Sequence, residues 1–158
     1  MIFLATPPSI QNNMPETATG PLSHDACISL ESSSTYGRFI SSHSSGSFVT
    51  DSKASNGGPG IAVNAAELLL SALASCALGL VYKKATELGI SPTHASVKGY
   101  CKRSEDDGSR YDFITLLFQI KGVHADEAQE LVDSFVTHCP IYNTLLRGDS
   151  NITARLSD

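Results

Sequence analysis

The sequence predicts a single α+β domain with the element order β-β-β-α-β-β-α-α-β, on three observations. Short alternating apolar and polar runs occupy the first third of the chain, one long apolar run follows, and the second half holds a hairpin signal and a helical apolar period. A length of 158 residues, 41% hydrophobic and 17% charged, fits one domain with a real core. Since strands and helices do not alternate regularly, a doubly wound sheet is not expected.

The first third of the chain predicts a leader followed by a meander of three strands. Residues 1–24 mix four prolines with polar residues and are predicted to be a flexible leader before the domain of residues 25–158. Ser45-Gly46 predicts a turn between two short strands, and Cys27 falls on the polar face of the strand before them. The three predicted strands are residues 26–30, 37–42 and 47–51.

A long helix is predicted after the glycine-rich loop of residues 54–60. Asn64 and Glu67 have the spacing of a capping box, in which each side chain satisfies the other residue's backbone donor. Residues 68–81 are apolar on nearly every side, so we expect a central helix buried on most of its surface. Gly89 ends this helix.

The second half of the chain predicts a hairpin, two helices and a last strand. Asp107-Gly108 is a strong turn signal between two strand-like runs, and apolar residues then recur at helical spacing up to Pro140. The predicted elements are strands at 96–103 and 111–121, a helix beginning near Asp126, a short helix from Pro140 to Arg147 with Cys139 as its cap, and a strand at 151–156.

Neither a nucleic-acid partner nor a membrane partner is expected. The formal net charge is −5, from 16 acidic and 11 basic residues, and no basic cluster exceeds two residues, so the chain has no electrostatic footprint for phosphate binding. The most apolar stretch, residues 68–82, would span roughly 22 Å as a helix, against the ~30 Å core of a bilayer. Residues 1–4 lack the features of a secretory signal. We therefore expect a cytoplasmic protein.

The four cysteines are Cys27, Cys76, Cys101 and Cys139. In a reducing compartment we expect thiols, metal ligands or redox catalysts rather than structural disulfides. No two cysteines have CxxC spacing and no histidine cluster completes a zinc pattern, so neither a metal nor a cofactor is expected.

Cys76 and Cys139 lie where the predicted structure would control their reactivity. Cys76 shares the apolar surface of the long helix, where a free cysteine is most simply inert packing. Cys139 precedes the short helix, whose unsatisfied N–H groups and dipole stabilise a thiolate, although a cysteine before proline can be a plain turn residue. Local chemistry therefore favours Cys139 as the more activated thiol.

Two further side chains have both a structural and a functional interpretation. Glu67 either completes the capping box with Asn64 or, if that end of the helix is buried, pairs with a cation such as Arg38. His138 is either a base for the neighbouring Cys139 or a group that complements the dipole at the end of its helix. The residues alone leave both choices open.

Several motifs occur in order along the chain and together resemble one family. They are the segment Asn64-Ala-Ala-Glu-Leu-Leu-Leu-Ser-Ala-Leu-Ala-Ser-Cys76, then Cys139-Pro140 after an interval of 63 residues from Cys76, and Thr144-Leu145. The glycine-rich loop, the polar hairpin and the helix before the second cysteine belong to the same pattern. From about residue 25 to its end, the chain resembles the OsmC/Ohr family of thiol-dependent hydroperoxide reductases.

The resemblance implies an intertwined homodimer, with curved antiparallel sheets around central helices and sites built from both subunits. It also implies that Cys76, rather than Cys139, is the peroxidatic thiol, which reverses the local ranking. The Cys76 thiolate would reduce an organic hydroperoxide to an alcohol and become a sulfenic acid, which Cys139 would convert to a disulfide. A dithiol reductant such as a lipoylated protein would then restore both thiols.

The resemblance further implies a cation at the Cys76 thiolate. The hydroperoxide-resistance branch has an arginine in a Gly-Gly-Arg turn and a glutamate ten residues before the peroxidatic cysteine. Here Tyr36-Gly37-Arg38 resembles this turn. Ala66 occupies the glutamate position, and Glu67 lies nine residues before Cys76, as in the OsmC-like branch. We expect Arg38 to support the thiolate and Glu67 to orient the guanidinium.

Two hypotheses for the function follow. The first is a cytoplasmic peroxidase of the oxidative stress response, with Cys76, Cys139, Arg38 and Glu67 in its site. The alternative is a non-catalytic dimer of the same fold that binds an apolar or electrophilic ligand at the subunit interface.

Overall fold

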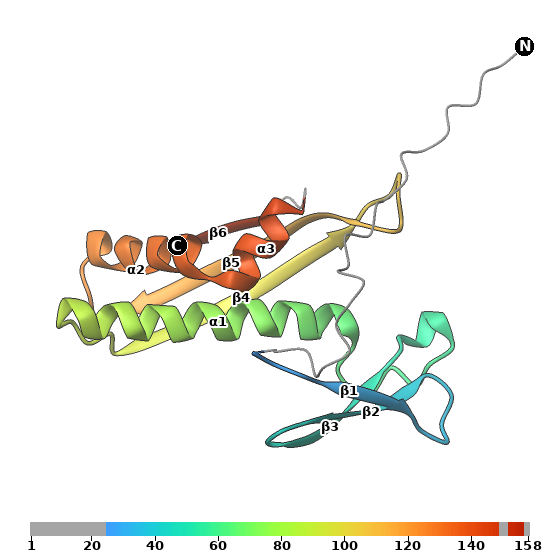
Figure 1. Ribbon diagram of the computed structural model, residues 1–158. Coiled ribbons are helices and arrows are strands. Elements are labelled where there is room, and N and C mark those ends of the chain that lie inside the picture. The colour runs from blue at the N-terminus through green and yellow to red at the C-terminus, as the bar shows by residue number, and fades with distance from the viewer. Residues whose placement is uncertain (1–24, 149–151, 157–158) are drawn as a thin grey trace, which may run out of the picture.

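The computed structural model describes residues 25–148 and 152–156, and its order of strands and long helices confirms the predicted α+β order (Figure 1). The predicted leader, residues 1–24, lies outside the described residues. The elements are β1 (Ser29–Ser32), β2 (Arg38–His43), β3 (Gly46–Asp51), a 3-10 turn (Ala54–Asn56), α1 (Ala65–Leu88), β4 (His94–Arg103), β5 (Tyr111–Lys121), α2 (Ala125–His138), α3 (Pro140–Arg147) and β6 (Ile152–Leu156).

The first sheet is an antiparallel meander in the order β1-β2-β3. Its first strand starts later than predicted, at Ser29, where pairing with β2 begins opposite Ser42. Cys27 therefore lies before the strand, not on one of its faces, and is exposed.

The second sheet has the order β4-β5-β6 and is mixed. Strands β4 and β5 form the predicted antiparallel hairpin, whereas β6 runs parallel to β5, from Ile114 opposite Ile152 to Phe118 opposite Leu156. The expectation of wholly antiparallel sheets is thus wrong for this edge. The reason is the connection, since α2 and α3 return the chain to the end of the sheet at which β5 began.

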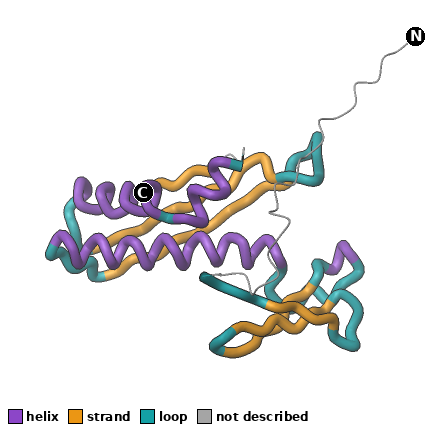
Figure 2. Tube along the Cα trace, viewed as in Figure 1, coloured by secondary structure: helices purple, strands orange, loops and turns teal. Residues whose placement is uncertain are grey.

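Helices α1 and α2 cover the second sheet and enclose the core (Figures 1 and 2). Phe118 of β5 meets Phe135 of α2 with ring centroids 5.5 Å apart, and Phe135 meets Tyr142 of α3 at 5.1 Å. Tilted aromatic contacts at these separations favour one arrangement of α2, α3 and the sheet. The core therefore fixes the corner between α2 and α3, where Cys139 lies.

The start and end of α1 follow the predicted signals. Asn64 Oδ1 accepts hydrogen bonds from the backbone N–H groups of Ala66 (3.0 Å) and Glu67 (3.3 Å), and Glu67 Oε2 accepts one from the N–H of Asn64 (2.9 Å). Gly89 then ends the helix in the left-handed region with φ 69°. The capping-box interpretation of Glu67 is confirmed.

Only one stripe of α1 is buried within one chain, so the prediction of a helix buried on most sides is wrong at this level. The fully or almost fully buried positions recur every four residues, at Leu73, Ala77, Val81 and Ala85. Just 17% of the most apolar 18-residue window is buried. Leu69, Leu70 and Leu80 are partly buried beside this stripe, whereas Ala72 and Tyr82 are exposed, so part of the apolar surface of α1 is left uncovered by its own chain.

The length of α1 also corrects the argument that the apolar segment is too short for a bilayer. A helix of 24 residues spans about 36 Å, and by length and composition α1 passes for a membrane-crossing helix. Core helices pass the same test, and the buried stripe of α1 packs on the core shared with α2 and β5.

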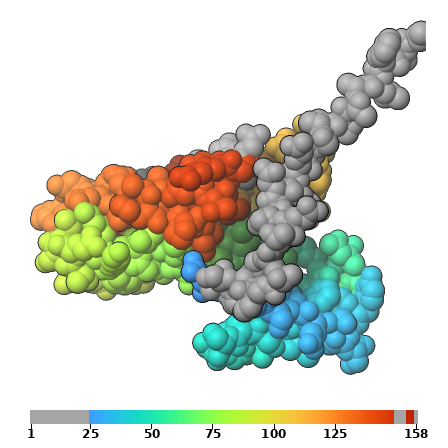
Figure 3. Space-filling model, viewed as in Figure 1, coloured from blue at the N-terminus to red at the C-terminus, as the bar shows by residue number. Residues whose placement is uncertain are grey.

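The first sheet projects from the rest of the molecule beside the start of α1 (Figure 3). Ile40 and Val49 lie directly opposite each other on one of its faces and are 45% and 41% exposed. An apolar pair open to water on a three-stranded sheet is a surface that another element would be expected to cover.

Candidate functional site

Cys76 and Cys139 are brought together by the fold, with their sulfur atoms 2.7 Å apart. Cys76 lies in the middle of α1, and Cys139 lies at the corner where α2 ends and α3 begins. Both residues are free thiols, and an S–S bond measures ~2.05 Å, so little movement separates the thiol pair from a disulfide. The pairing that the resemblance implied is geometrically available within one chain.

The two sulfur atoms have different surroundings. Cys139 is 0% exposed, and its sulfur accepts a hydrogen bond from the Tyr142 N–H at 3.3 Å, which confirms the predicted cap of α3. Cys76 is only partly buried. Cys76 is therefore the more accessible of the two residues to a reagent from solvent, whereas the buried Cys139 is in contact with the sulfur of Cys76.

Burial raises the pKa of the Cys76 thiol to about 12, and the contact with Cys139 acts in the same direction. A thiol with such a pKa is protonated at neutral pH and is a poor nucleophile. Reactivity at Cys76 therefore calls for a cation beyond those that its own chain places beside it.

Arg38 forms a bidentate ion pair, but its partner is Asp51. Arg38 Nε lies 2.8 Å from Asp51 Oδ1, and Nη2 lies 2.9 Å from Oδ2. Asp51 Oδ2 also accepts the backbone N–H groups of Ile61 (3.1 Å) and Ala62 (2.9 Å). The hydrogen bond from Arg38 lowers the pKa of Asp51 most, and the two backbone hydrogen bonds and the positive charge of Arg38 act in the same direction. Burial acts in the opposite direction but is outweighed, so the pKa lies well below its ordinary value.

Within the described residues of one chain, Glu67 makes no ion pair with Arg38. Glu67 is exposed, and its carboxylate is bonded to the backbone of Asn64 in the capping box. Asp51 holds the guanidinium instead, since the β2–β3 register places it directly opposite Arg38. Residue types alone did not point to Asp51, although counting outward from the turn between His43 and Gly46 pairs it with Arg38.

One chain does not bring Arg38 to Cys76. The groups that shift the Cys76 pKa are its buried surroundings and Cys139, and Arg38 is not among them. Arg38 belongs to β2 of the projecting first sheet, while Cys76 lies halfway along α1 (Figure 1). The four predicted site residues thus fall into three places: the thiol pair, the Arg38 ion pair and the cap at Glu67.

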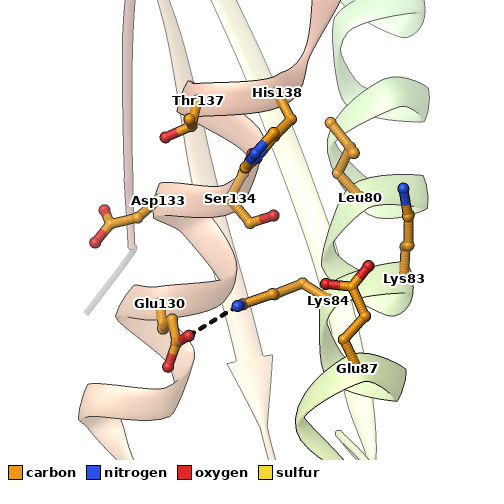
Figure 4. Close-up of a pocket in the computed structure, with 9 residues that line it drawn as sticks. All are labelled: Leu80, Lys83, Lys84, Glu87, Glu130, Asp133, Ser134, Thr137 and His138. Carbon is orange, nitrogen blue, oxygen red and sulfur yellow. Dashed lines mark hydrogen bonds and ion pairs between the residues drawn. The ribbon is translucent and has the colours of Figure 1, made fainter.

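His138 faces a groove between α1 and α2 (Figure 4). Its Nδ1 lies 3.0 Å from the carbonyl oxygen of Ser134, which favours the interpretation as a group that complements the last turn of α2. The groove has a volume of about 480 Å³ and is crossed by the ion pair of Lys84 with Glu130 at 2.9 Å. Its lining is mostly polar and charged and includes neither Cys76 nor Cys139.

The other two cysteines take no part in the thiol pair. Cys27 is exposed, and Cys101 lines a pocket of about 360 Å³ between the first sheet, the start of α1 and the β4–β5 hairpin. Across residues 25–148 and 152–156, no group of three His, Cys, Asp or Glu side chains is placed to hold a metal ion.

The fold and the site define an α+β domain built around two adjacent thiols, one on a central helix and one at a helix cap. The sequence model of the family described as OsmC-like protein matches residues 57–155. The chain therefore belongs to the OsmC-like family. A comparison with curated proteins gives no match.

Solved structures share this fold at low sequence identity. A hypothetical protein from Aquifex aeolicus is 20% identical, with a TM-score of 0.72 over 85% of this chain and 96% of its own. The organic hydroperoxide resistance protein OsmC from Legionella pneumophila is 20% identical, with a TM-score of 0.66 over 87% and 100% of the two chains. The organic hydroperoxide resistance protein OhrB of Bacillus subtilis is 20% identical, with a TM-score of 0.62 over 85% and 98%.

Proposed function

We propose that this protein is a cysteine-based peroxidase that reduces organic hydroperoxides to alcohols. The observation that carries the proposal is the 2.7 Å contact between a partly exposed Cys76 and a buried Cys139. Structural neighbours that are named as organic hydroperoxide resistance proteins support the same chemistry. The pKa of the Cys76 thiol is raised by burial, so the site needs a cation that stabilises the thiolate.

The reaction follows from the two environments. The Cys76 thiolate attacks one oxygen of the peroxide, an S–O bond forms, the O–O bond breaks, and the alkoxide takes a proton and leaves as the alcohol. Cys139 then attacks the sulfenic sulfur, an S–S bond forms, and the hydroxyl leaves as water. An external dithiol reduces the disulfide by exchange and is itself oxidised to a disulfide.

The catalytic unit that we propose is a homodimer. Part of the apolar surface of α1 is uncovered within one chain, and Ile40 and Val49 are exposed beside Arg38 on the first sheet. A second copy would cover both surfaces and would place Arg38 of one subunit at Cys76 of the other. The dimer thereby supplies the cation that one chain lacks at its own thiol.

The reductant that we propose is a dithiol of the cytoplasm, such as a lipoylated protein. Exchange with a small or flexible dithiol suits a disulfide in which Cys76 is partly exposed and Cys139 is buried. A reducing compartment is also where an adjacent pair of free cysteines stays reduced between turnovers.

Mass spectrometry after one equivalent of cumene hydroperoxide tests the peroxidase. We expect the loss of two hydrogens and a peptide in which Cys76 is linked to Cys139. A Cys101→Ser variant is the matched control and should give the same product, since Cys101 lies in a different pocket. An unchanged mass at both thiols would favour the alternative, a non-catalytic dimer that binds an apolar or electrophilic ligand at its interface.

A further inference from the structure

The ion pair between Arg38 and Asp51 is unusually well fixed on its acidic side. The Asp51 side chain is 0% exposed and takes part in four hydrogen bonds, two from Arg38 and two from the backbone of Ile61 and Ala62. The Arg38 side chain is 31% exposed. The carboxylate is therefore the anchored member of the pair, and the guanidinium is the member that reaches the surface.

The backbone around this pair is also held in place. Gly37, at φ 73°, precedes Arg38, and a Cβ there would lie 2.7 Å from the Cα of Gly58. The N–H of Ser52, next to Asp51, donates to the carbonyl of Gly37 at 2.7 Å. The glycine-rich loop thus packs against the turn that carries the arginine, and neither end of the ion pair is free to drift.

The guanidinium lies on the side of the sheet that its own helices leave open. Arg38 and Asp51 share a face with the exposed pair Ile40 and Val49, because alternate residues of a strand point to the same face. Phe39 lies on the opposite face and, together with the buried Asp51, lines the pocket against the start of α1, whereas Arg38 is not among the residues that line it. The partly exposed Arg38 is thus the member of the ion pair that lies at the surface, on the face with Ile40 and Val49.

The geometry of the pair leaves donors for a ligand. Asp51 engages Nε and Nη2, which uses two of the five N–H donors of a guanidinium. Among the described residues, no hydrogen bond is made by Nη1. The outer edge of Arg38 therefore remains for a thiolate or a peroxide oxygen, and the inner edge holds it in position.

We infer that Asp51 is the positioning residue of the catalytic arginine: it fixes Arg38 from within the first sheet, so that the outer edge of the guanidinium meets the Cys76 thiolate of the partner subunit. The inference rests on the proposed peroxidase. It places the orienting acid on β3 instead of on α1, where Ala66 and the capping residue Glu67 leave no acid for this task.

The pH dependence of Cys76 alkylation tests the inference without any peroxide. Iodoacetamide labelling of the Cys76 peptide is followed by mass spectrometry in the full-length protein, in Asp51→Asn, in Arg38→Met and in the double variant. In Asp51→Asn the side-chain amide places N–H donors against the N–H donors of the Arg38 guanidinium, which is thereby displaced. The pH midpoint of Cys76 labelling then rises toward that of Arg38→Met. The double variant shows no further rise, because Asp51 acts through Arg38.

Hydroperoxide turnover supplies a second readout. A displaced arginine lowers kcat/KM by roughly tenfold to a hundredfold, the scale of a small misplacement at a reacting centre. Asp107→Asn is the matched control, since it makes the same change in an exposed Arg–Asp pair of the β4–β5 hairpin. This control leaves both the labelling midpoint and turnover at the values of the unmodified protein.

An alkylation midpoint that is unchanged or lowered in Asp51→Asn overturns the inference. An additive rise of the midpoint in the double variant does so too. The same holds if the midpoint of Arg38→Met equals that of the unmodified protein. If Asp51→Asn does not fold, Arg38→Lys decides: it keeps the charge but loses the bidentate contact, and its midpoint must rise. Absence of the peroxide-driven disulfide in the unmodified protein would refute the peroxidase alone, since the alkylation profile does not depend on turnover.

Discussion

The sulfur of Cys139 lies 2.7 Å from the sulfur of Cys76, although 63 positions separate the two residues in the sequence. The contact depends on the corner between α2 and α3, which the aromatic contacts of Phe135 hold against β5 and α3. The two thiols also differ in access, because only Cys76 is partly exposed. The first prediction rests on this difference in access.

Substitution of each thiol should give a different defect. Cys76→Ser should abolish peroxide consumption, because no other described cysteine combines access with a neighbouring thiol. Cys139→Ser should allow one turnover and trap Cys76 as a sulfenic acid, detected by dimedone labelling. Dimedone labelling of Cys139 in the Cys76→Ser protein would instead show that the local ranking, which favoured Cys139, was right.

Association of two copies is the second prediction, and sedimentation measures it. We expect a stable dimer at micromolar concentration, since one chain leaves part of the apolar α1 surface and the Ile40–Val49 pair uncovered. Ala72→Glu, which places a charge on the exposed side of α1, should weaken the dimer, whereas Gln129→Glu on the exposed side of α2 should not. A stable monomer of the unmodified chain would contradict the shared site.

The stability of the first sheet should depend on pH through Asp51. Its pKa is lowered in the folded protein, so the ionised carboxylate stabilises the fold above the unfolded-state value of about 4. That contribution is lost as the pH falls below 4 toward the folded-state pKa. Urea denaturation between pH 2 and pH 6 should therefore show a steeper acid loss in the unmodified protein than in Asp51→Asn. Parallel curves would show that Asp51 does not couple to folding.

The close packing of the glycine-rich loop gives a prediction for Gly58. A Cβ at this position would lie 2.6 Å from the Cβ of Ser52, so Gly58→Ala should destabilise the protein by about 1–3 kcal/mol. Gly108→Ala is the matched control, because a Cβ on Gly108 would meet nothing within 4 Å. Thermal unfolding should show a drop of roughly 2–4 °C per kcal/mol for the first variant only. Equal melting temperatures for the two variants would count against this packing.

Sequence patterns were sufficient where the signal is local. The spacing of Asn64 and Glu67 identified the start of α1, and Pro140 identified the cap at Cys139, because each of these structures is completed within a few residues. The Arg38–Asp51 pair spans 13 positions and depends on strand register, so residue types alone did not reveal it. The parallel β6 likewise depends on the path of α2 and α3.

The exposure of α1 marks a different limit of the sequence. An apolar pattern shows that a helix surface is covered, but it does not say whether the same chain or a second chain covers it. The prediction of a helix buried on most sides failed for this reason, since only the stripe from Leu73 to Ala85 is buried within one chain.

The last prediction tests whether Arg38 and Cys76 of one site come from different chains. One chain carries Arg38→Met and keeps Cys76, and the other carries Cys76→Ser and keeps Arg38. Each homodimer should be inactive or slowed about a hundredfold, because every site lacks either the thiol or the cation. In the mixed dimer, one of the two sites joins the intact Cys76 to the intact Arg38 across the interface, whereas the other site lacks both. The mixed dimer should therefore recover about half of the unmodified activity per dimer. If both groups of a site came from the same chain, the mixed dimer would contain no intact site. Its activity would then not exceed that of the Arg38→Met homodimer.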